Sequence, residues 1–332
     1  MDTDSTLLLS EKDVQTVFKD DLNIAMELVE KSFIKRMNND VLLPDKISQV
    51  FDEKTQKRIN CMPATLLSDG ICGVKWVSVF PQNPLSHIRN VTGTIILSEL
   101  KHGLTLSVLD GTYITSIRTA AVGGTAAKYL AVENASAIGF IGAGREARRH
   151  LDALKAARPS LKECRVSSRR SVTVSAFIEE EQAKYPDMKF IACGNDFQKA
   201  VSGADIIVTA TSTQADLLKA DWVKNGALYI HVGGWEDEFA VAQKANKIVC
   251  DEWESIKHRT QTLSRMYKAG LLKDEDIYAD LGEIISHKVP GRENSQEFIY
   301  FCSVGLAFID VMFAKYAYDR CLENGLGTKF NL

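Results

Sequence analysis

Three small residues near the middle of the chain have the spacing of a phosphate-binding turn. Gly142, Gly144 and Ala147 form a G-x-G-x-x-A motif that follows an apolar segment, Ala137–Ile141. The first glycine permits a tight turn, the second lets the backbone approach a pyrophosphate, and the alanine allows close packing of helix on strand. The N–H groups at the start of the following helix attract the anion. The motif predicts a dinucleotide-binding site, against the alternative of a plain tight turn.

The segment after the next expected strand bears on which dinucleotide binds. NAD-binding domains usually carry an acidic residue about 20 positions after the motif, where it binds the ribose 2′-hydroxyl. Here Ser168, Arg169 and Arg170 follow the strand, with no acidic residue at its tip. Guanidinium groups form charge-assisted hydrogen bonds with phosphate. We therefore favour NADP(H), with NAD(H) as the alternative. The interpretation without a binding role is that the two arginines belong to a solvated loop.

An alternation of strands and helices from Ser136 onward must position this motif. It is typical of a parallel sheet covered by helices. Thr209 ends, and Thr211 follows, a strand after which many Rossmann folds pass the backbone over the nicotinamide ribose; an ordinary Thr-rich strand end is the alternative. The expected strands are Ala137–Ile141, Glu163–Ser167, Lys189–Ala192, Ile206–Thr209, Ala227–Val232 and Lys247–Cys250, and the expected helices are Glu146–Ala157, Ser171–Lys184 and Phe197–Val201.

The first 130 residues mix helices and strands without this alternation. Ser10, followed by acidic residues, predicts the start of a helix. Helical spacing also marks Ile24–Met37, Thr115–Leu130 and a long C-terminal segment, Gly305–Asn324. Strands are expected at Ile71–Phe80, Gly93–Leu97 and Leu104–Leu109, and the last two are expected to form a hairpin.

Composition restricts the class of protein. The 332 residues carry a formal net charge of -3 and are 45% hydrophobic, as in an ordinary globular protein. This balance gives no reason to expect nucleic acid or an anionic membrane as partner. No apolar run approaches the roughly 20 residues of a membrane helix, and the N-terminus lacks signal-peptide features, so the expected location is the cytoplasm. The seven cysteines and six histidines are scattered, and no disulfide framework or metal site is expected.

Short segments spread over nearly the whole chain resemble the ornithine cyclodeaminase/mu-crystallin family. They are Met62–Ala64, Gly73–Trp76, Phe80–Pro84, Gly93–Leu97, Leu109–Gly111, Ile117–Ala121, the Gly142 motif, Leu281–Glu283, Pro290–Glu293 and Ser303–Ala307. The resemblance implies that the protein is a homodimer. It also implies hydride transfer at the Cα–N bond of amino or imino acids, the reaction of the family's members. It implies an α/β fold with a Rossmann domain at 131–304, and an α+β substrate and dimerisation domain at 1–130 and 305–332.

The resemblance also assigns roles to individual residues. Lys75 matches the family's active-site lysine, and it lies on an apolar strand where a buried lysine needs a partner or a function; a snorkelling surface lysine is the alternative. Arg118 matches the arginine that binds the substrate carboxylate, the alternative being a surface salt bridge, and Lys46 more loosely matches a further carboxylate ligand. The expected cofactor-binding residues are Gly142, Ala143, Gly144, Arg145, Glu146, Ser168, Arg169, Arg170, Thr209, Thr211 and Gly305.

Within the family, three activities are open. The leading one is an NAD(P)-dependent oxidoreductase of an amino acid, imino acid or N-carboxyalkyl amino acid. The second is an ornithine-type cyclodeaminase, but Trp235 stands where cyclodeaminases carry an aspartate, and Glu236 or Asp237 could replace it only with a shifted turn. The third is a crystallin-like protein that binds cofactor without turnover. Three short segments resemble the family's dehydrogenases of 2,3-diaminopropionate formation, which act on N-(2-amino-2-carboxyethyl)-glutamate: Lys247–Trp253, Pro290–Glu293 and Gly327–Leu332.

Overall fold

The computed structural model describes residues 5–331, which form two compact units of α/β architecture. Unit 1 contains the chain up to Arg118 and from Leu306 onward, and unit 2 contains Thr119–Gly305. Both ends of the chain therefore belong to the same unit. The boundary between the units falls inside one helix, α3 (Thr112–Leu130).

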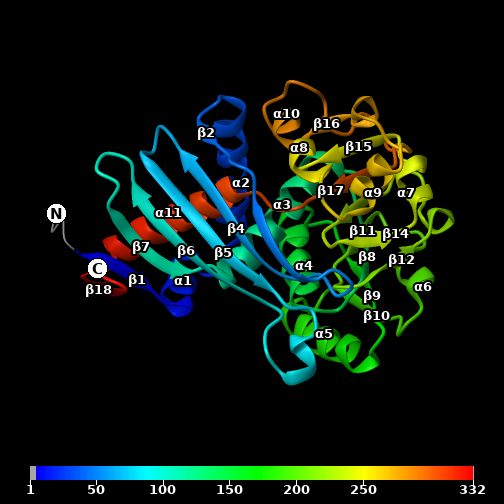
Figure 1. The fold of residues 1–332 in the computed structure, drawn as a ribbon. Helices are drawn as coiled ribbons and strands as arrows, with labels where there is room; N and C mark the ends of the chain where they lie inside the picture. The colour runs from blue at the N-terminus through cyan, green and yellow to red at the C-terminus, as the bar shows by residue number, and fades with distance from the viewer. Residues whose placement is uncertain (1–4, 332) are drawn as a thin grey trace. The chain divides into compact units, whose positions relative to one another are not determined.

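Unit 1 is a sheet of eight strands with helices packed on one face (Figure 1). The strand order is β18-β1-β7-β6-β5-β4-β2, and β3 also pairs with β4. Only β1 and β7 run parallel; the other pairs are antiparallel. The elements are β1 (Thr6–Leu9), α1 (Glu11–Phe18), α2 (Leu22–Met37), β2 (Val41–Leu42), β3 (Ile47–Asp52), β4 (Lys57–Leu66), β5 (Ile71–Val79), β6 (Val91–Glu99), β7 (Thr105–Asp110), α11 (Ala307–Glu323) and β18 (Thr328–Phe330).

The C-terminal helix α11 covers the middle of this sheet, where Figure 1 draws it in red behind the blue and cyan strands. Its apolar residues are almost all buried, so its stability comes from packing on β4, β5 and β6 and on the helices α1 and α2. Gly73 on β5 allows this close approach, because a Cβ there would come within 3.1 Å of Val311. The helix is thus held against the strand that carries Lys75.

Unit 2 contains a sheet of eight parallel strands in the order β10-β9-β8-β11-β13-β17-β15-β16, and a separate pair, β12 and β14. This is the Rossmann-like sheet that the alternation of elements predicts. The elements are β8 (Ala137–Ile141), α4 (Arg145–Ala157), β9 (Glu163–Ser167), α5 (Ser171–Lys184), β10 (Lys189–Ala192), α6 (Phe197–Val201), β11 (Ile206–Thr209), β12 (Gln214–Leu218), β13 (Leu228–His231), β14 (Trp235–Asp237), α7 (Phe239–Lys244), β15 (Lys247–Cys250), α8 (Trp253–Ile256), α9 (Thr262–Lys268), β16 (Ala279–Asp280), α10 (Leu281–Ile285) and β17 (Ile299–Cys302).

Most expected elements are present, and the differences have local causes. Ser10 caps α1 through a capping box with Asp13, as its position predicts. Sequence analysis did not predict β4, which contains Pro63, and proline lacks the N–H that a strand interior normally uses. The expected hairpin is present as β6 and β7. Residues 1–4 and Leu332, which belong to the expected terminal segments, lie outside the described part of the chain.

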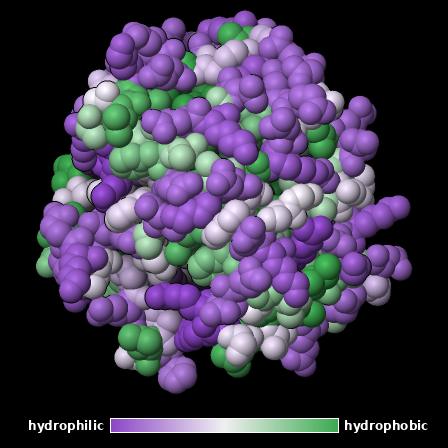
Figure 2. Space-filling model, turned by 90° about the vertical axis from the view of Figure 1, so that its right-hand side faces the viewer, coloured by the Kyte–Doolittle hydropathy of each residue, from purple (hydrophilic) through white to green (hydrophobic). Residues whose placement is uncertain are grey.

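The surface in Figure 2 is mainly hydrophilic, and its hydrophobic residues form small separate groups. Among residues 5–331, no helix has the length and apolar character needed to cross a bilayer.

Candidate functional site

A buried cluster of two cations and one carboxylate lies in unit 1. Lys75 is on β5, Arg118 on α3 and Asp310 on α11. The Lys75 Nζ lies 2.6 Å from Asp310 Oδ2, and Arg118 Nε donates to Asp310 Oδ1 at 2.9 Å. The side chains of Lys75, Arg118 and Asp310 are 1%, 7% and 0% exposed. Three elements therefore bring together the two basic residues that the family resemblance selected.

The cluster carries an uncompensated positive charge. Burial and the nearby Arg118 lower the pKa of Lys75 to about 8, although Asp310 opposes this shift. The Lys75 Nζ is paired with Asp310 Oδ2, and an ammonium carries three protons, so it can also donate to a second acceptor. Arg118 uses Nε for Asp310, which leaves its two Nη groups for another acceptor. Buried cations with one shared carboxylate favour a second anion, and a guanidinium suits a carboxylate.

Asp310 is the site residue that sequence reasoning missed. It lies within the apolar run from Leu306 to Ala314, and it is the only charged residue in that run. A lone acidic residue in a buried helix needs a positive partner, and this signal was available from the sequence. Lys46 lies half-buried between β2 and β3. Its role as a carboxylate ligand stays a prediction.

The two glycines of the dinucleotide turn in unit 2 differ in the space that surrounds them. Gly142 has a φ of 112°, and a Cβ there would lie 2.5 Å from the Ala210 carbonyl oxygen, so the fold itself requires glycine. Ala147 is fully buried at the contact of α4 with the sheet. Gly144 caps α4 without a side-chain cap, and a Cβ there would meet nothing within 4 Å. The protein places no steric demand on Gly144, which suits a position that a pyrophosphate approaches closely.

The other predicted residues around this turn differ in accessibility. Ala143 is buried and its carbonyl accepts a hydrogen bond from Arg148, whereas Arg145 is exposed and Glu146 is half-buried. Beyond β9, the Ser168 backbone N–H donates to Gly194 at 2.7 Å. Arg169 and Arg170 follow it and are exposed. Two exposed guanidinium groups therefore lie just beyond the carboxyl end of β9.

The remaining three predicted residues, Thr209, Thr211 and Gly305, form hydrogen bonds to buried carboxyl groups of unit 2. Thr209 ends β11 with its side chain fully buried, and its hydroxyl donates to Glu236 Oε2 at 2.9 Å. Gly305 is buried, and its N–H donates to Asp251 Oδ2 at 3.0 Å. Thr211 follows β11 and is half-buried, with its N–H bound to Glu236 Oε1 at 2.6 Å. These groups are engaged within unit 2.

A buried polar cluster lies under the carboxyl ends of β11, β13 and β17. Thr209, His231 and Cys302 occupy neighbouring register positions at these ends. Glu236 and Asp237 on β14 are both fully buried, and burial raises the pKa of each carboxyl to about 7. Burial also lowers the pKa of His231 to about 4. A pKa of about 7 lets each carboxyl be charged or neutral near neutral pH, whereas His231 is neutral there.

Neither acid of β14 is presented on the surface. Asp237 accepts from Thr262, Tyr229 and Tyr300, and Glu236 accepts from Thr209 and two backbone N–H groups. The preceding residue, Trp235, is half-buried, and its Nε1 donates to Asp216 at 2.6 Å. The residue that begins β14 is therefore an indole bound to Asp216, and the two acids that follow it are enclosed.

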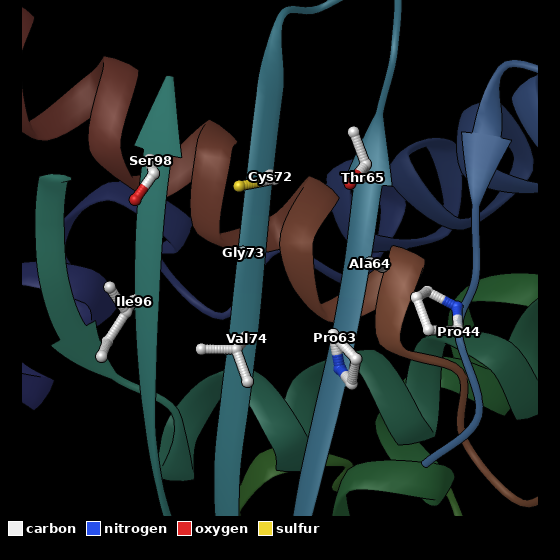
Figure 3. Close-up of a pocket in the computed structure, with 9 residues that line it drawn as sticks. All are labelled: Pro44, Pro63, Ala64, Thr65, Cys72, Gly73, Val74, Ile96 and Ser98. Carbon is white, nitrogen blue, oxygen red and sulfur yellow. The ribbon is translucent and has the colours of Figure 1, made fainter. Parts of the chain in front are cut away.

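A shallow pocket also lies on the sheet of unit 1, but on the opposite face from Lys75. Figure 3 shows its residues on the side of the strands turned away from α11. Lys75 and Val74 are neighbours on β5 and therefore point to opposite faces of the sheet. The pocket lining is Pro44, Pro63, Ala64, Thr65, Cys72, Gly73, Val74, Ile96 and Ser98. This pocket is separate from the cationic cluster.

Comparison with known proteins relates nearly the whole chain to one family. The profile of the ornithine cyclodeaminase/mu-crystallin family matches residues 5–325. The chain is 30% identical to a Thermococcus litoralis Δ1-pyrroline-2-carboxylate reductase solved with NADH and L-proline, with a TM-score of 0.91 over 97% of this chain and 99% of that one. It is 31% identical to an archaeal alanine dehydrogenase dimer with bound NAD, with a TM-score of 0.88 over 98% and 99%.

A relative with a different substrate also matches over the full length. The N-((2S)-2-amino-2-carboxyethyl)-L-glutamate dehydrogenase of Staphylococcus aureus is 26% identical over 98% of both chains. The chain therefore belongs to the ornithine cyclodeaminase/mu-crystallin family, as its short motifs predict.

Proposed function

We propose that this protein is an NAD(P)-dependent oxidoreductase that acts on the Cα–N bond of an amino or imino acid. The observation that carries the proposal is the buried Lys75–Arg118–Asp310 cluster, whose net positive charge suits the carboxylate common to these substrates. The accessible turn at Gly144 supports dinucleotide binding in unit 2. The similar reductase and dehydrogenase support the same class of reaction.

In this proposal, each residue of the cluster has a separate role. The Nη groups of Arg118 bind the substrate carboxylate and fix the position of Cα, because a misplacement of about 1 Å can cost on the order of 100-fold in rate. Lys75 lies beside the same anion and holds or releases a proton as the nitrogen changes between amine and imine. Asp310 keeps both cations in place. A bound nicotinamide supplies the hydride donor or acceptor.

The cyclodeaminase is the second candidate, and the turn after β13 disfavours it. Glu236 and Asp237 are enclosed and hydrogen-bonded, and Trp235 occupies the outer position. No carboxylate of β14 is therefore free to act on a substrate amine. The diaminopropionate-forming dehydrogenase remains the specific proposal to test within the oxidoreductases, supported by the full-length Staphylococcus aureus relative.

The cofactor preference and the cellular setting are further proposals. Arg169 and Arg170, exposed beyond β9, favour the 2′-phosphate of NADP(H) over NAD(H). Calorimetric Kd values for NADPH and NADH test this preference; a tenfold tighter NADH would refute it. The seven cysteines are all unpaired, which supports a reducing compartment such as the cytoplasm.

Steady-state kinetics of two variants tests the proposed site. Lys75→Ala should lower kcat by at least about 100-fold, the low end for a general acid–base group. Arg118→Lys should mainly raise KM, because a lysine cannot reproduce the planar fork. Lys101→Ala, at an exposed turn of the same unit, is the control. Turnover near that of the wild type in both site variants, on a substrate that the wild type converts, would overturn the proposal.

A further inference from the structure

Three loops of unit 2 meet at the carboxyl ends of β8, β11 and β13. The Gly142 turn after β8 packs against the Ala210 carbonyl and the Thr211 side-chain methyl, both of which follow β11. The Thr211 N–H donates to Glu236 Oε1 at 2.6 Å, and the Gly233 N–H, after β13, donates to Glu236 Oε2 at 3.0 Å. One carboxyl group on β14 thus ties the loop after β13 to the loop that supports the Gly142 turn.

Glu236 and its neighbour Asp237 differ in the groups that they bind. Asp237 accepts only from hydroxyl groups, those of Thr262, Tyr229 and Tyr300. A hydroxyl can rotate and exchange the donor and acceptor roles. Backbone N–H groups cannot do so, because each has a fixed direction and only donates. Replacing the Glu236 carboxyl by an amide therefore points an NH₂ group at one of these N–H donors or leaves that donor unpaired.

We propose that Glu236 is a positioning residue for the dinucleotide, because it fixes the loops after β11 and β13 against the Gly142 turn. This inference rests on the proposed binding of NAD(P) in unit 2. In that Rossmann architecture the cofactor lies across the carboxyl ends of the strands, where these loops are. Glu236 is fully buried and acts through the backbone of the loops, without touching the cofactor.

The test compares Glu236→Gln with Asp237→Asn by isothermal titration calorimetry without substrate. Both variants replace a fully buried acid of β14 with its amide. Glu236→Gln should raise the Kd of NADPH and NADH by at least about tenfold each. Asp237→Asn should raise either Kd less than threefold. At saturating cofactor, the KM of the amino acid should change less than threefold in Glu236→Gln, since the carboxylate ligands lie in unit 1.

Two results would overturn the inference: unchanged cofactor affinity in folded Glu236→Gln, or equal losses of affinity in the two variants. If Glu236→Gln does not fold, Gly233→Ala tests the same contact from the solvent side, because its Cβ would collide with the Glu236 carboxyl and displace it. It should also weaken cofactor binding by about tenfold, and unchanged affinity would count against the inference. A wild-type protein that binds neither cofactor would instead refute the proposed function.

Discussion

Asp310 determines what the two basic residues around it can do. It is fully buried and shared by Lys75 and Arg118, so neither cation is neutralised completely. Removing one partner of a buried ion pair typically costs about 3–5 kcal/mol, because a charge is left without compensation. Asp310 therefore has a structural role that cannot be separated from its electrostatic one, and Lys75 and Arg118 are better positions for testing chemistry.

The pKa of Lys75 predicts the pH dependence of the reaction. Burial, with Arg118 nearby, lowers this pKa from 10.5 to about 8. The ammonium form therefore declines as the pH rises through about 8. If Lys75 donates a proton to the nitrogen during imine reduction, kcat/KM for reduction should fall over this range, while amine oxidation, which needs the neutral amine as base, should rise.

Rate profiles of the wild type and Lys75→Arg between pH 6 and 10 provide the measurement. Arginine stays protonated over this range, so the profile of the variant lacks any contribution from the titration of residue 75. A reduction profile that keeps the same fall near pH 8 in Lys75→Arg would assign that fall to another group.

At the level of elements, the two glycines of the turn after β8 should respond differently to substitution. Gly144→Val should abolish cofactor binding with little loss of stability, because the space around its Cβ is open. Gly142→Ala should lower the melting temperature, because of its positive φ and its contact with Ala210. Thermal denaturation and calorimetric cofactor binding separate the two effects. A Gly144→Val protein with wild-type affinity would show that the motif is only a structural turn.

These elements also show which parts of the structure could be predicted from the sequence. The Gly142 motif is local, so its strand, turn and helix could be predicted from a short run of residues. The pairing of Arg118 with Asp310 joins residues 192 positions apart, and periodicity carries no information about such a contact. Glu236 escaped prediction as a backbone ligand because its partners, Thr211 and Gly233, are identified only once β12 and β14 pair.

At the level of the whole molecule, the open face of the unit 1 sheet is the surface that we propose for a homodimer. Ile47, Trp76 and Ile96 are 62%, 45% and 40% exposed, and they occupy register positions on the same face of neighbouring strands. Ile96 lines the shallow pocket of Figure 3, and Trp76 and Ile47 lie on strands of the same sheet. The similar archaeal alanine dehydrogenase is a dimer with bound NAD, which supports a second copy of this chain as the occupant.

Light scattering after size-exclusion chromatography tests this surface. The wild type should have the mass of a dimer, and Trp76→Glu should shift it to a monomer, because burying an unpaired charge opposes association. Leu271→Glu, at an exposed apolar residue of unit 2, should leave the dimer intact and serves as the control. A Trp76→Glu protein that remains dimeric would place the interface elsewhere.

The central claim is that this protein carries out net hydride transfer on an amino or imino acid. The most direct test follows the absorbance of NADPH and NADH while the enzyme is given a panel of imino, amino and N-carboxyalkyl amino acids, Δ1-pyrroline-2-carboxylate and N-(2-amino-2-carboxyethyl)-glutamate included. We expect one equivalent of reduced cofactor to be consumed per imine reduced, or formed per amine oxidised. Release of ammonia from a diamino acid without any net change in NAD(P)H would contradict the claim and identify a cyclodeaminase.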